Sequence, residues 1–192
     1  ILEWINTHNT PTDLILQVNI ILSDVSFNIP SEDFEAGVEK LGKILGFASQ
    51  RPEKSSGTGS DNLWNIFGNQ YWLISCKNEV DKDREFISKK EAGQLSNDIG
   101  WFAQEYPGCN AKPIFIHPAK QLKENAFLDT PSYVITLEKL DMLKKNIENF
   151  YKELSSISKK ELTLNMITRK LQYYHLDPFN LNQDYFEPIS KA

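Results

Sequence analysis

Two side chains that can do chemistry together, Asp61 and Lys77, bracket a pair of predicted strands over residues 62–67 and 70–76. Residues two apart on a strand face the same side of a sheet, so position 75 and Lys77 share a face. A carboxylate near a lysine can hold a hard cation such as Mg²⁺ while the ammonium stabilises developing negative charge. A second acid at position 75 would complete such a site, but Ser75 stands there and is a weak, neutral ligand.

The turn between the two strands decides whether Asp61 and Lys77 can meet. A Gly-Asn pair separates the two runs, which is a hairpin signal. A strict two-residue turn would set Asp61 opposite Cys76, on the other sheet face from Lys77. A three-residue loop or a β-bulge would set Asp61 opposite Ser75 and restore a common face. A functional site therefore requires the less simple turn.

The composition narrows the class of protein. The 192 residues are 40% hydrophobic, enough for one domain, or one with a helical appendage. No apolar run approaches the ~20 residues of a membrane span and no secretory signal is present, so we expect a cytosolic protein with no membrane partner. The two cysteines match no zinc spacing. The net charge of −5 argues against broad electrostatic attraction to nucleic acid. Because the chain starts at Ile1, we expect a piece of something longer.

Apolar periodicity predicts the elements that must position these residues. Their order, two helices, two strands, a helix, two strands and two helices, indicates a small mixed α/β sheet with flanking helices. We divide the chain into an N-terminal helical lead-in (1–30), a central domain (31–155) and a C-terminal helical extension (156–192). The predicted helices cover 10–25, 31–46, 88–106, 137–154 and 162–175, the further strands cover 112–117 and 133–136, residues 49–60 are a loop, and the tail after 178 is polar.

Several short motifs, in this order, resemble the PD-(D/E)xK nuclease superfamily. More closely, they are similar to the domain at the C-terminus of bacterial DEAD/DEAH-helicase-like proteins. The resemblance covers roughly residues 34–154, and each motif alone is weak while the ordered set is fairly specific. The motifs are Phe34–Gly42, Ser60–Trp64, Ile74–Asn78, Ile87–Leu95, Trp101-Phe102 and Pro113–Pro118.

The resemblance implies a restriction-endonuclease-like fold and a metal-dependent DNA endonuclease using Mg²⁺ or Mn²⁺. It implies Asp61 and Glu39 as metal ligands, Lys77 as the catalytic lysine and Gln94 as a helix residue lining the site. The expected partners are DNA, a helicase domain of the same parent protein and a second copy in a homodimer. Two lysines at the start of the helix that carries Gln94, Lys89 and Lys90, are candidate contacts to nucleic acid.

Ser75 stands where that family has glutamate, and three accounts of it remain open. The domain is a degenerate nuclease, or Glu39 or Glu79 compensates, or the serine replaces a natural acid. Glu79 is four strand residues from Ser75, about 13 Å away, so Glu39 is the better candidate. The alternative function is a pseudonuclease that binds DNA or organises its parent protein. Taken singly, Asp61 could cap a turn and Lys77 could be a solvated edge residue.

Overall fold

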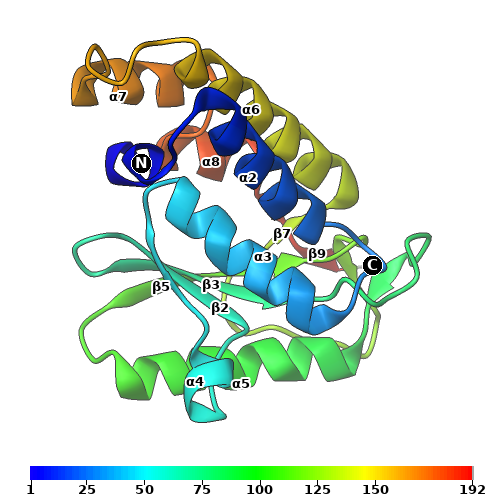
Figure 1. Ribbon diagram of the computed structural model, residues 1–192. Coiled ribbons are helices and arrows are strands. Elements are labelled where there is room, and N and C mark those ends of the chain that lie inside the picture. The colour runs from blue at the N-terminus through cyan, green and yellow to red at the C-terminus, as the bar shows by residue number, and fades with distance from the viewer. Residues whose placement is uncertain (192) are drawn as a thin grey trace.

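A six-stranded mixed sheet runs through the protein in the order β1-β2-β3-β5-β7-β8, in a computed structural model that describes residues 1–191 (Figure 1). β1, β2 and β3 are antiparallel, β3, β5 and β7 are parallel, and β8 is antiparallel to β7. A second, three-stranded parallel sheet has the order β4-β6-β9. The expected mixed α/β sheet with flanking helices is confirmed. The elements are α1 (Leu2–Thr7), α2 (Pro11–Asp24), α3 (Ser31–Ile44), β1 (Ala48–Gln50), α4 (Pro52–Ser56), β2 (Asn62–Phe67), β3 (Gln70–Cys76), β4 (Phe86–Ile87), α5 (Lys89–Glu105), β5 (Asn110–Ile116), β6 (Gln121–Leu122), β7 (Tyr133–Ile135), α6 (Leu137–Ser155), α7 (Leu164–Tyr173), α8 (Pro178–Asp184), β8 (Glu187–Pro188) and β9 (Ser190–Lys191).

The β2–β3 hairpin contains the irregularity that a functional site requires. Phe67 pairs with Gln70 next to the turn, but Asn62 pairs with Ile74 at the far end, because the register shifts between Asn65 and Phe67. Continued by one residue, this register sets Asp61 opposite Ser75. The bulge therefore carries position 61 to the sheet face that Lys77 shares.

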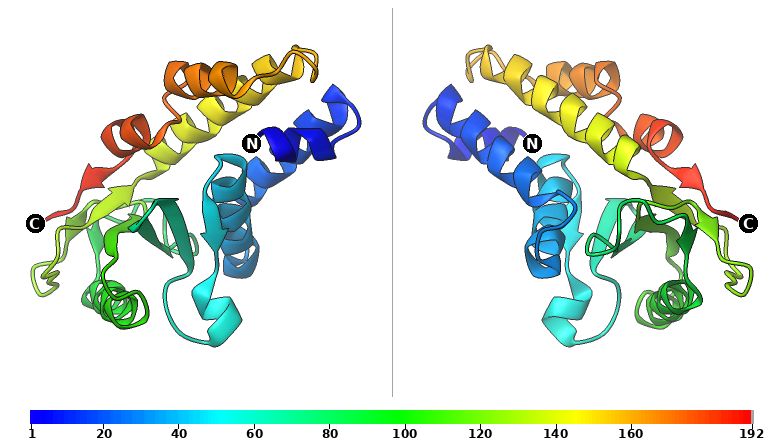
Figure 2. Two further views of the ribbon diagram at one scale, coloured as in Figure 1. Left: turned by 90° about the vertical axis from the view of Figure 1, so that its left-hand side faces the viewer. Right: turned by 90° about the vertical axis from the view of Figure 1, so that its right-hand side faces the viewer.

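The two faces of the sheet pack against different helices. Trp64, Trp72 and Ile74 belong to the buried cluster that contains residues of α2, α3 and α6. Leu63 and Leu73 alternate with them and belong to a second cluster with the apolar residues of α5. Figures 1 and 2 show α5 on the side of the sheet away from α6. Since Ser75 and Lys77 continue the alternation of Leu73, they lie on the α5 side.

The predicted loop and the polar C-terminal tail both contain secondary structure. Residues 48–50 form β1, which pairs with β2, and Pro52 occupies the first turn of the short helix α4. The stretch after Pro178, predicted as polar, forms α8 and β8 and buries Leu181, Tyr185 and Phe186. Residues before 31 and after 155 share one buried cluster with the central segment.

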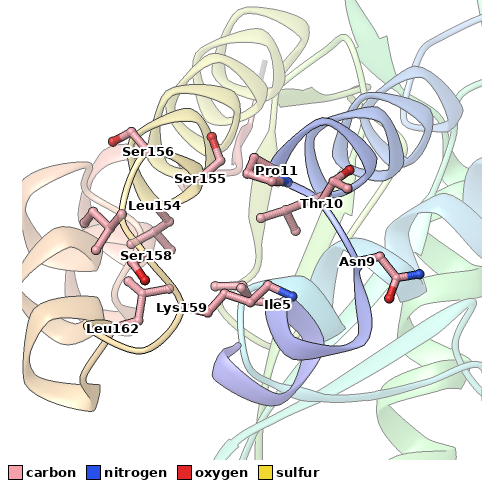
Figure 3. A pocket seen from close by; sticks show the side chains of 12 residues that line it. Ile5, Asn9, Thr10, Pro11, Leu154, Ser155, Ser156, Ser158, Lys159 and Leu162 are labelled. Carbon is pink, nitrogen blue, oxygen red and sulfur yellow. The ribbon is translucent and has the colours of Figure 1, made fainter.

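A hollow of ≈ 330 Å³ lies where the α1–α2 connection faces the α6–α7 connection (Figure 3). Its walls are mostly apolar, with Ile5 and Leu14 on one side and Leu154 and Leu162 on the other. The Lys159 ammonium donates to the His8 carbonyl and joins the two connections. None of the lining residues belongs to the Asp61 region. The hollow lies between the helix connections and is separate from the candidate site. Within residues 1–191, no helix is both long and apolar enough to cross a membrane.

Candidate functional site

Asp61 lies just before β2 and is fixed by the chain around it. Its Oδ2 accepts the Cys76 backbone N–H at 2.5 Å and the Ser75 hydroxyl at 3.3 Å. Two residues earlier, Gly59 has φ +101° and approaches the Trp101 ring of α5 so closely that a Cβ would lie 2.7 Å from it. The loop that carries Asp61 is therefore held against both β3 and α5.

Lys77 meets Asp61 at the end of β3. Its Nζ lies 4.0 Å from Asp61 Oδ2, and the two side chains are 18% and 12% exposed. Both groups are thus accessible to a ligand while remaining mostly screened from bulk water. The Cys76 thiol beside them is no candidate nucleophile, because burial raises its pKa well above the usual value.

Glu53 of α4 is a carboxyl group whose ionisation is affected by Asp61. A hydrogen bond with the Asp61 side chain and partial burial both raise the pKa of Glu53, and the nearby charges of Asp61 and Glu35 add to that shift. Two carboxyl groups that share a hydrogen bond cannot both be ionised at low cost. The pair is therefore suited to receiving a cation, which would stabilise both charges.

Asp98 adds a further acid from the opposite helix, α5. Burial raises its pKa to about 7, with further contributions from the charges of Asp61 and Glu53 against the opposing effect of Lys77. Gln94 lies one helical turn before Asp98 and its side chain is exposed. Asp98 is therefore the α5 side chain that interacts electrostatically with Asp61, and the role of Gln94 stays a prediction.

After Glu53 and Asp98, Glu35 of α3 is the third carboxyl group that interacts with Asp61. Burial raises the pKa of Glu35, and the Asp61 charge raises it further, although a hydrogen bond from Arg51 lowers it. The Arg51 guanidinium bridges Glu35 at 2.5 Å and Glu32 at 3.0 Å. Glu39, one turn further along α3, instead pairs with Lys43 at 2.5 Å. Its role as a metal ligand stays a prediction.

Glu79 interacts with the backbone at the start of α3. Its Oε1 accepts the backbone N–H of Ser31 at 3.0 Å, at the start of α3. A carboxylate there satisfies an unpaired helix donor and interacts favourably with the helix dipole. Compensation for Ser75 by Glu79 would require the loss of this contact. Pro30 precedes Ser31 as the N-cap residue, so Ser31 is the first residue of the helix rather than its cap.

A buried network fixes the start of α5, and with it the position of Asp98. His117 is fully buried and follows Ile116, which pairs with Cys76 of β3. The His117 Nδ1 accepts the Ala119 N–H at 2.8 Å, and Nε2 lies 3.6 Å from Glu91 Oε1. Burial alone would raise the pKa of Glu91, but the nearby His117 ring and the hydrogen bonds from Ser88 outweigh it and lower the pKa to about 2.

Lys89 and Lys90 occupy the first turn of α5 and are exposed. Basic side chains there lie at the positive end of the helix dipole, so neither stabilises the helix through that dipole. Neither lysine forms an ion pair among the described residues. Their contact with nucleic acid stays a prediction.

Comparisons with known proteins add one structural likeness. Neither a comparison with protein-family models nor one with curated proteins gives a match. Among solved structures, the chain is similar to the small subunit of the heterodimeric restriction endonuclease R.BspD6I. The two share 15% sequence identity over 82% of this chain and 95% of that subunit, with a TM-score of 0.40. A likeness at this level carries no functional argument, so the function of this chain is argued from its own residues.

The side chains around Asp61 fit a hard divalent cation in donor type. Within residues 1–191, no three His, Cys, Asp or Glu side chains gather into a complete ligand set. Mg²⁺, however, is usually held by one or two carboxylates plus waters, and Asp61 with Glu53 supplies two. Glu35, Glu53 and Asp98 all have raised pKa values, because burial and the nearby charge of Asp61 both disfavour their ionised forms.

Three acids near Asp61 were not predicted from the sequence: Glu35, Glu53 and Asp98. The sequence could have indicated Asp98, because it lies three residues after Leu95 and four before Phe102. This spacing places it at the border of the apolar stripe of α5. Glu35 precedes the predicted helix acid by one turn, so only the angle at which α3 packs distinguishes the two. Glu53 gave no signal, because its helix is five residues long and was predicted as loop.

Proposed function

We propose that this chain is a metal-dependent phosphodiesterase that cleaves DNA, with its site around Asp61. The observation that carries the proposal is the Asp61–Lys77 approach of 4.0 Å at the bulged hairpin, beside Glu53, whose pKa Asp61 raises. Two carboxyl groups and a lysine at the ends of two interior strands match the needs of phosphodiester hydrolysis. The motif resemblance given above points to the same chemistry.

Asp61 and Glu53 would hold Mg²⁺ or Mn²⁺, and Ser75 would orient Asp61 through its hydroxyl. When bound, the ion would neutralise phosphate oxygens and lower the pKa of the attacking water. Lys77 would place positive charge where negative charge develops on the scissile phosphate. Asp98, on the opposite helix, would hold or release a proton at the same site. Glu39 would join the ligand set only by leaving Lys43.

A second candidate function is a binding module without cleavage. It is favoured by Ser75, whose neutral hydroxyl brings no charge to the site, and by the engagement of Asp61 Oδ2 with three groups of its own chain. In this version, the domain would bind DNA or hold a helicase-type part of the same protein, alone or as a homodimer.

Assays of plasmid and single-stranded DNA cleavage distinguish the nuclease from the binding module. We expect nicking with Mg²⁺ or Mn²⁺ and none with EDTA. Lys77→Ala should lower the rate about 100-fold, the usual effect of removing one transition-state charge partner. Lys123→Ala, an exposed lysine outside the site, is the matched control. Glu53→Gln should reduce activity more than Glu39→Gln, because Glu53 contacts Asp61.

The variant Ser75→Glu decides between an enzyme and a scaffold. Cleavage by Ser75→Glu but not by the natural chain would mean that the scaffold lacks one ligand, which supports the binding module. Absence of cleavage by both, with each folded by circular dichroism, would rule out the nuclease proposal. Equal activity in Lys77→Ala would rule out the assigned role of Lys77.

A further inference from the structure

A hollow of ≈ 670 Å³ opens at the other end of the β2–β3 hairpin from Asp61. Tyr71 and Trp72 of β3 line it, together with Phe67 at the hairpin tip and Phe179 of α8. The β3 strand separates the two places by seven residues, roughly 20 Å. The hollow is therefore distinct from the acidic site.

Two aromatic rings at its rim are unusually exposed. Phe67 is 65% exposed and Phe179 is 71% exposed, although they come from segments more than 100 residues apart in the sequence. Single exposed apolar residues need no explanation, but two rings that line one hollow form a surface on which a flat group can stack.

Lys112 provides a half-buried positive charge in the same wall. Its Nζ donates to the Asn182 side-chain oxygen and lies 4.1 Å from the centre of the Tyr133 ring, and both partners are neutral. Within residues 1–191, no carboxylate lies within ion-pair distance of Lys112. Burial lowers the pKa of Lys112, as expected for an ammonium with no charged partner. Buried charges are usually paired, so this one is suited to an anion from outside.

The one acid of the lining, Asp177, is engaged elsewhere. Its Oδ1 accepts the backbone N–H groups of Phe179 and Asn180 at 3.1 and 3.4 Å, at the start of α8. Its charge is thus directed at the backbone of α8, and Lys112 remains the charged group available to a ligand.

We propose that this hollow binds a nucleotide unit, with the base against Phe67 and Phe179 and the phosphate on Lys112. Base–aromatic stacking tolerates any base, and a lysine recognises phosphate as a point charge. The amide side chains in the wall, Asn110 and Asn182, offer donors and acceptors to a base edge. The proposal goes beyond the nuclease function and does not depend on it, since none of these residues belongs to the Asp61 site.

Binding measured without metal tests the proposal separately from cleavage. With EDTA present, we would titrate the full chain with thymidine 5′-monophosphate, thymidine and a 5′-phosphorylated ten-residue oligothymidylate, following heat and Trp fluorescence. The monophosphate should bind at least tenfold more tightly than thymidine. Lys112→Met should abolish that difference, whereas Phe67→Ala and Phe179→Ala should each weaken binding about tenfold.

Two controls match the chemistry of these changes. Lys144→Met removes another half-buried lysine, which is bonded to Val25 and Ser26, and Phe127→Ala removes another exposed ring. Neither should alter nucleotide binding, and thermal melting checks that each variant is folded. Binding of the oligonucleotide alone, with the same variant pattern, would support the proposal and identify a strand as the source. No binding of either phosphate ligand, equal affinity for thymidine, or unchanged affinity in Lys112→Met would overturn it.

Discussion

Ser75 acts on the orientation of Asp61 rather than on its charge. The Ser75 hydroxyl, the Cys76 N–H and the Lys77 ammonium all approach the same oxygen, Oδ2. A carboxylate held by two hydrogen bonds and a nearby cation loses rotational freedom, which pre-organises it for a ligand. A glutamate at position 75 would add charge there but would remove one of these bonds. The residue at position 75 can therefore orient Asp61, as serine does, or add a metal ligand, as glutamate would, but not both.

The raised pKa of Asp98 predicts that Asp98→Asn stabilises the protein. Its folded-state pKa is about 7 against an ordinary value of 3.8, so between these limits the folded chain binds more protons than the unfolded chain. The free energy of unfolding of the natural chain should thus fall as pH rises through this window. Asp98→Asn removes that loss, and because Asp98 is partly exposed we expect a gain of about 1–2 kcal/mol above pH 7.

Melting curves from pH 4 to pH 8 measure this gain. The variant and the natural chain should melt alike near pH 4, with the variant higher by about 3–6 °C at pH 8. Asp141→Asn, an exposed acid of α6, should show no such divergence. A variant that melts at the same temperature as the natural chain at pH 8 would mean that neither burial nor the nearby charges disfavour ionised Asp98.

At the scale of elements, the strongest sequence signals gave the correct structure. The strands 62–67 and 70–76 have the predicted bounds, and the predicted helix after Ser88 begins with a capping box formed by Ser88 and Glu91. The helix predicted over 10–25 forms as α2, with Thr10 as its cap and Pro11 as its first residue. Each of these signals is local, because hydrogen-bonded caps and turns involve residues only a few positions apart.

The elements that escaped prediction depend on partners distant in the sequence. The short strand β1 exists because β2 provides an antiparallel neighbour, and β8 exists because β7 does. The carboxyl group of Glu53 reaches the site only because α4 folds beside Asp61. The approach of Asp61 to Lys77 was therefore predictable from the sequence, whereas the three acids around them were not.

The loop before Asp61 depends on a glycine, so Gly59→Ala should destabilise the protein. A Cβ at position 59 would meet the Trp101 ring at 2.7 Å, and the φ of +101° is unfavourable for alanine. We expect a loss of about 2 kcal/mol, from backbone strain and overpacking together. Denaturant unfolding measures the loss, and activity should fall with it because Asp61 moves.

The matched control is Gly100→Ala on α5, where a Cβ would meet nothing within 4 Å. Alanine is the better helix former, so this variant should gain about 0.5–1 kcal/mol. Replacing Trp101 by leucine in the Gly59→Ala background should recover the steric part of the loss. An unchanged free energy of unfolding in Gly59→Ala would show that the loop moves freely away from α5.

Over the whole molecule, both ends of the chain contribute to the core of the sheet. Leu14 and Val18 of α2 lie in the same buried cluster as Tyr185 and Phe186 near the C-terminal end. The Asn146 amide donates to the Tyr185 hydroxyl at 2.7 Å, which joins α6 to the segment after α8. The helices beyond residue 155 therefore cover apolar surface that the central segment would otherwise expose.

This shared core predicts that residues 1–155 do not fold alone. Cutting after Ser155 removes β8 from the sheet and six buried side chains, each worth roughly 1.5–3 kcal/mol when fully buried. The sum is comparable with the ~5–15 kcal/mol that stabilises a typical protein. The removed side chains are Leu162, Ile167, Leu176, Leu181, Tyr185 and Phe186.

Thermal and urea unfolding of residues 1–155 should accordingly show no cooperative transition. A chain that ends at Ile189 is the matched control, because it loses only β9, whose Ser190 and Lys191 are exposed, and keeps β8. That control should unfold cooperatively with little change in midpoint, since it retains the core. Cooperative unfolding of residues 1–155 would instead establish a domain boundary near residue 155, and would mean that α7, α8 and β8 pack against a core already complete without them.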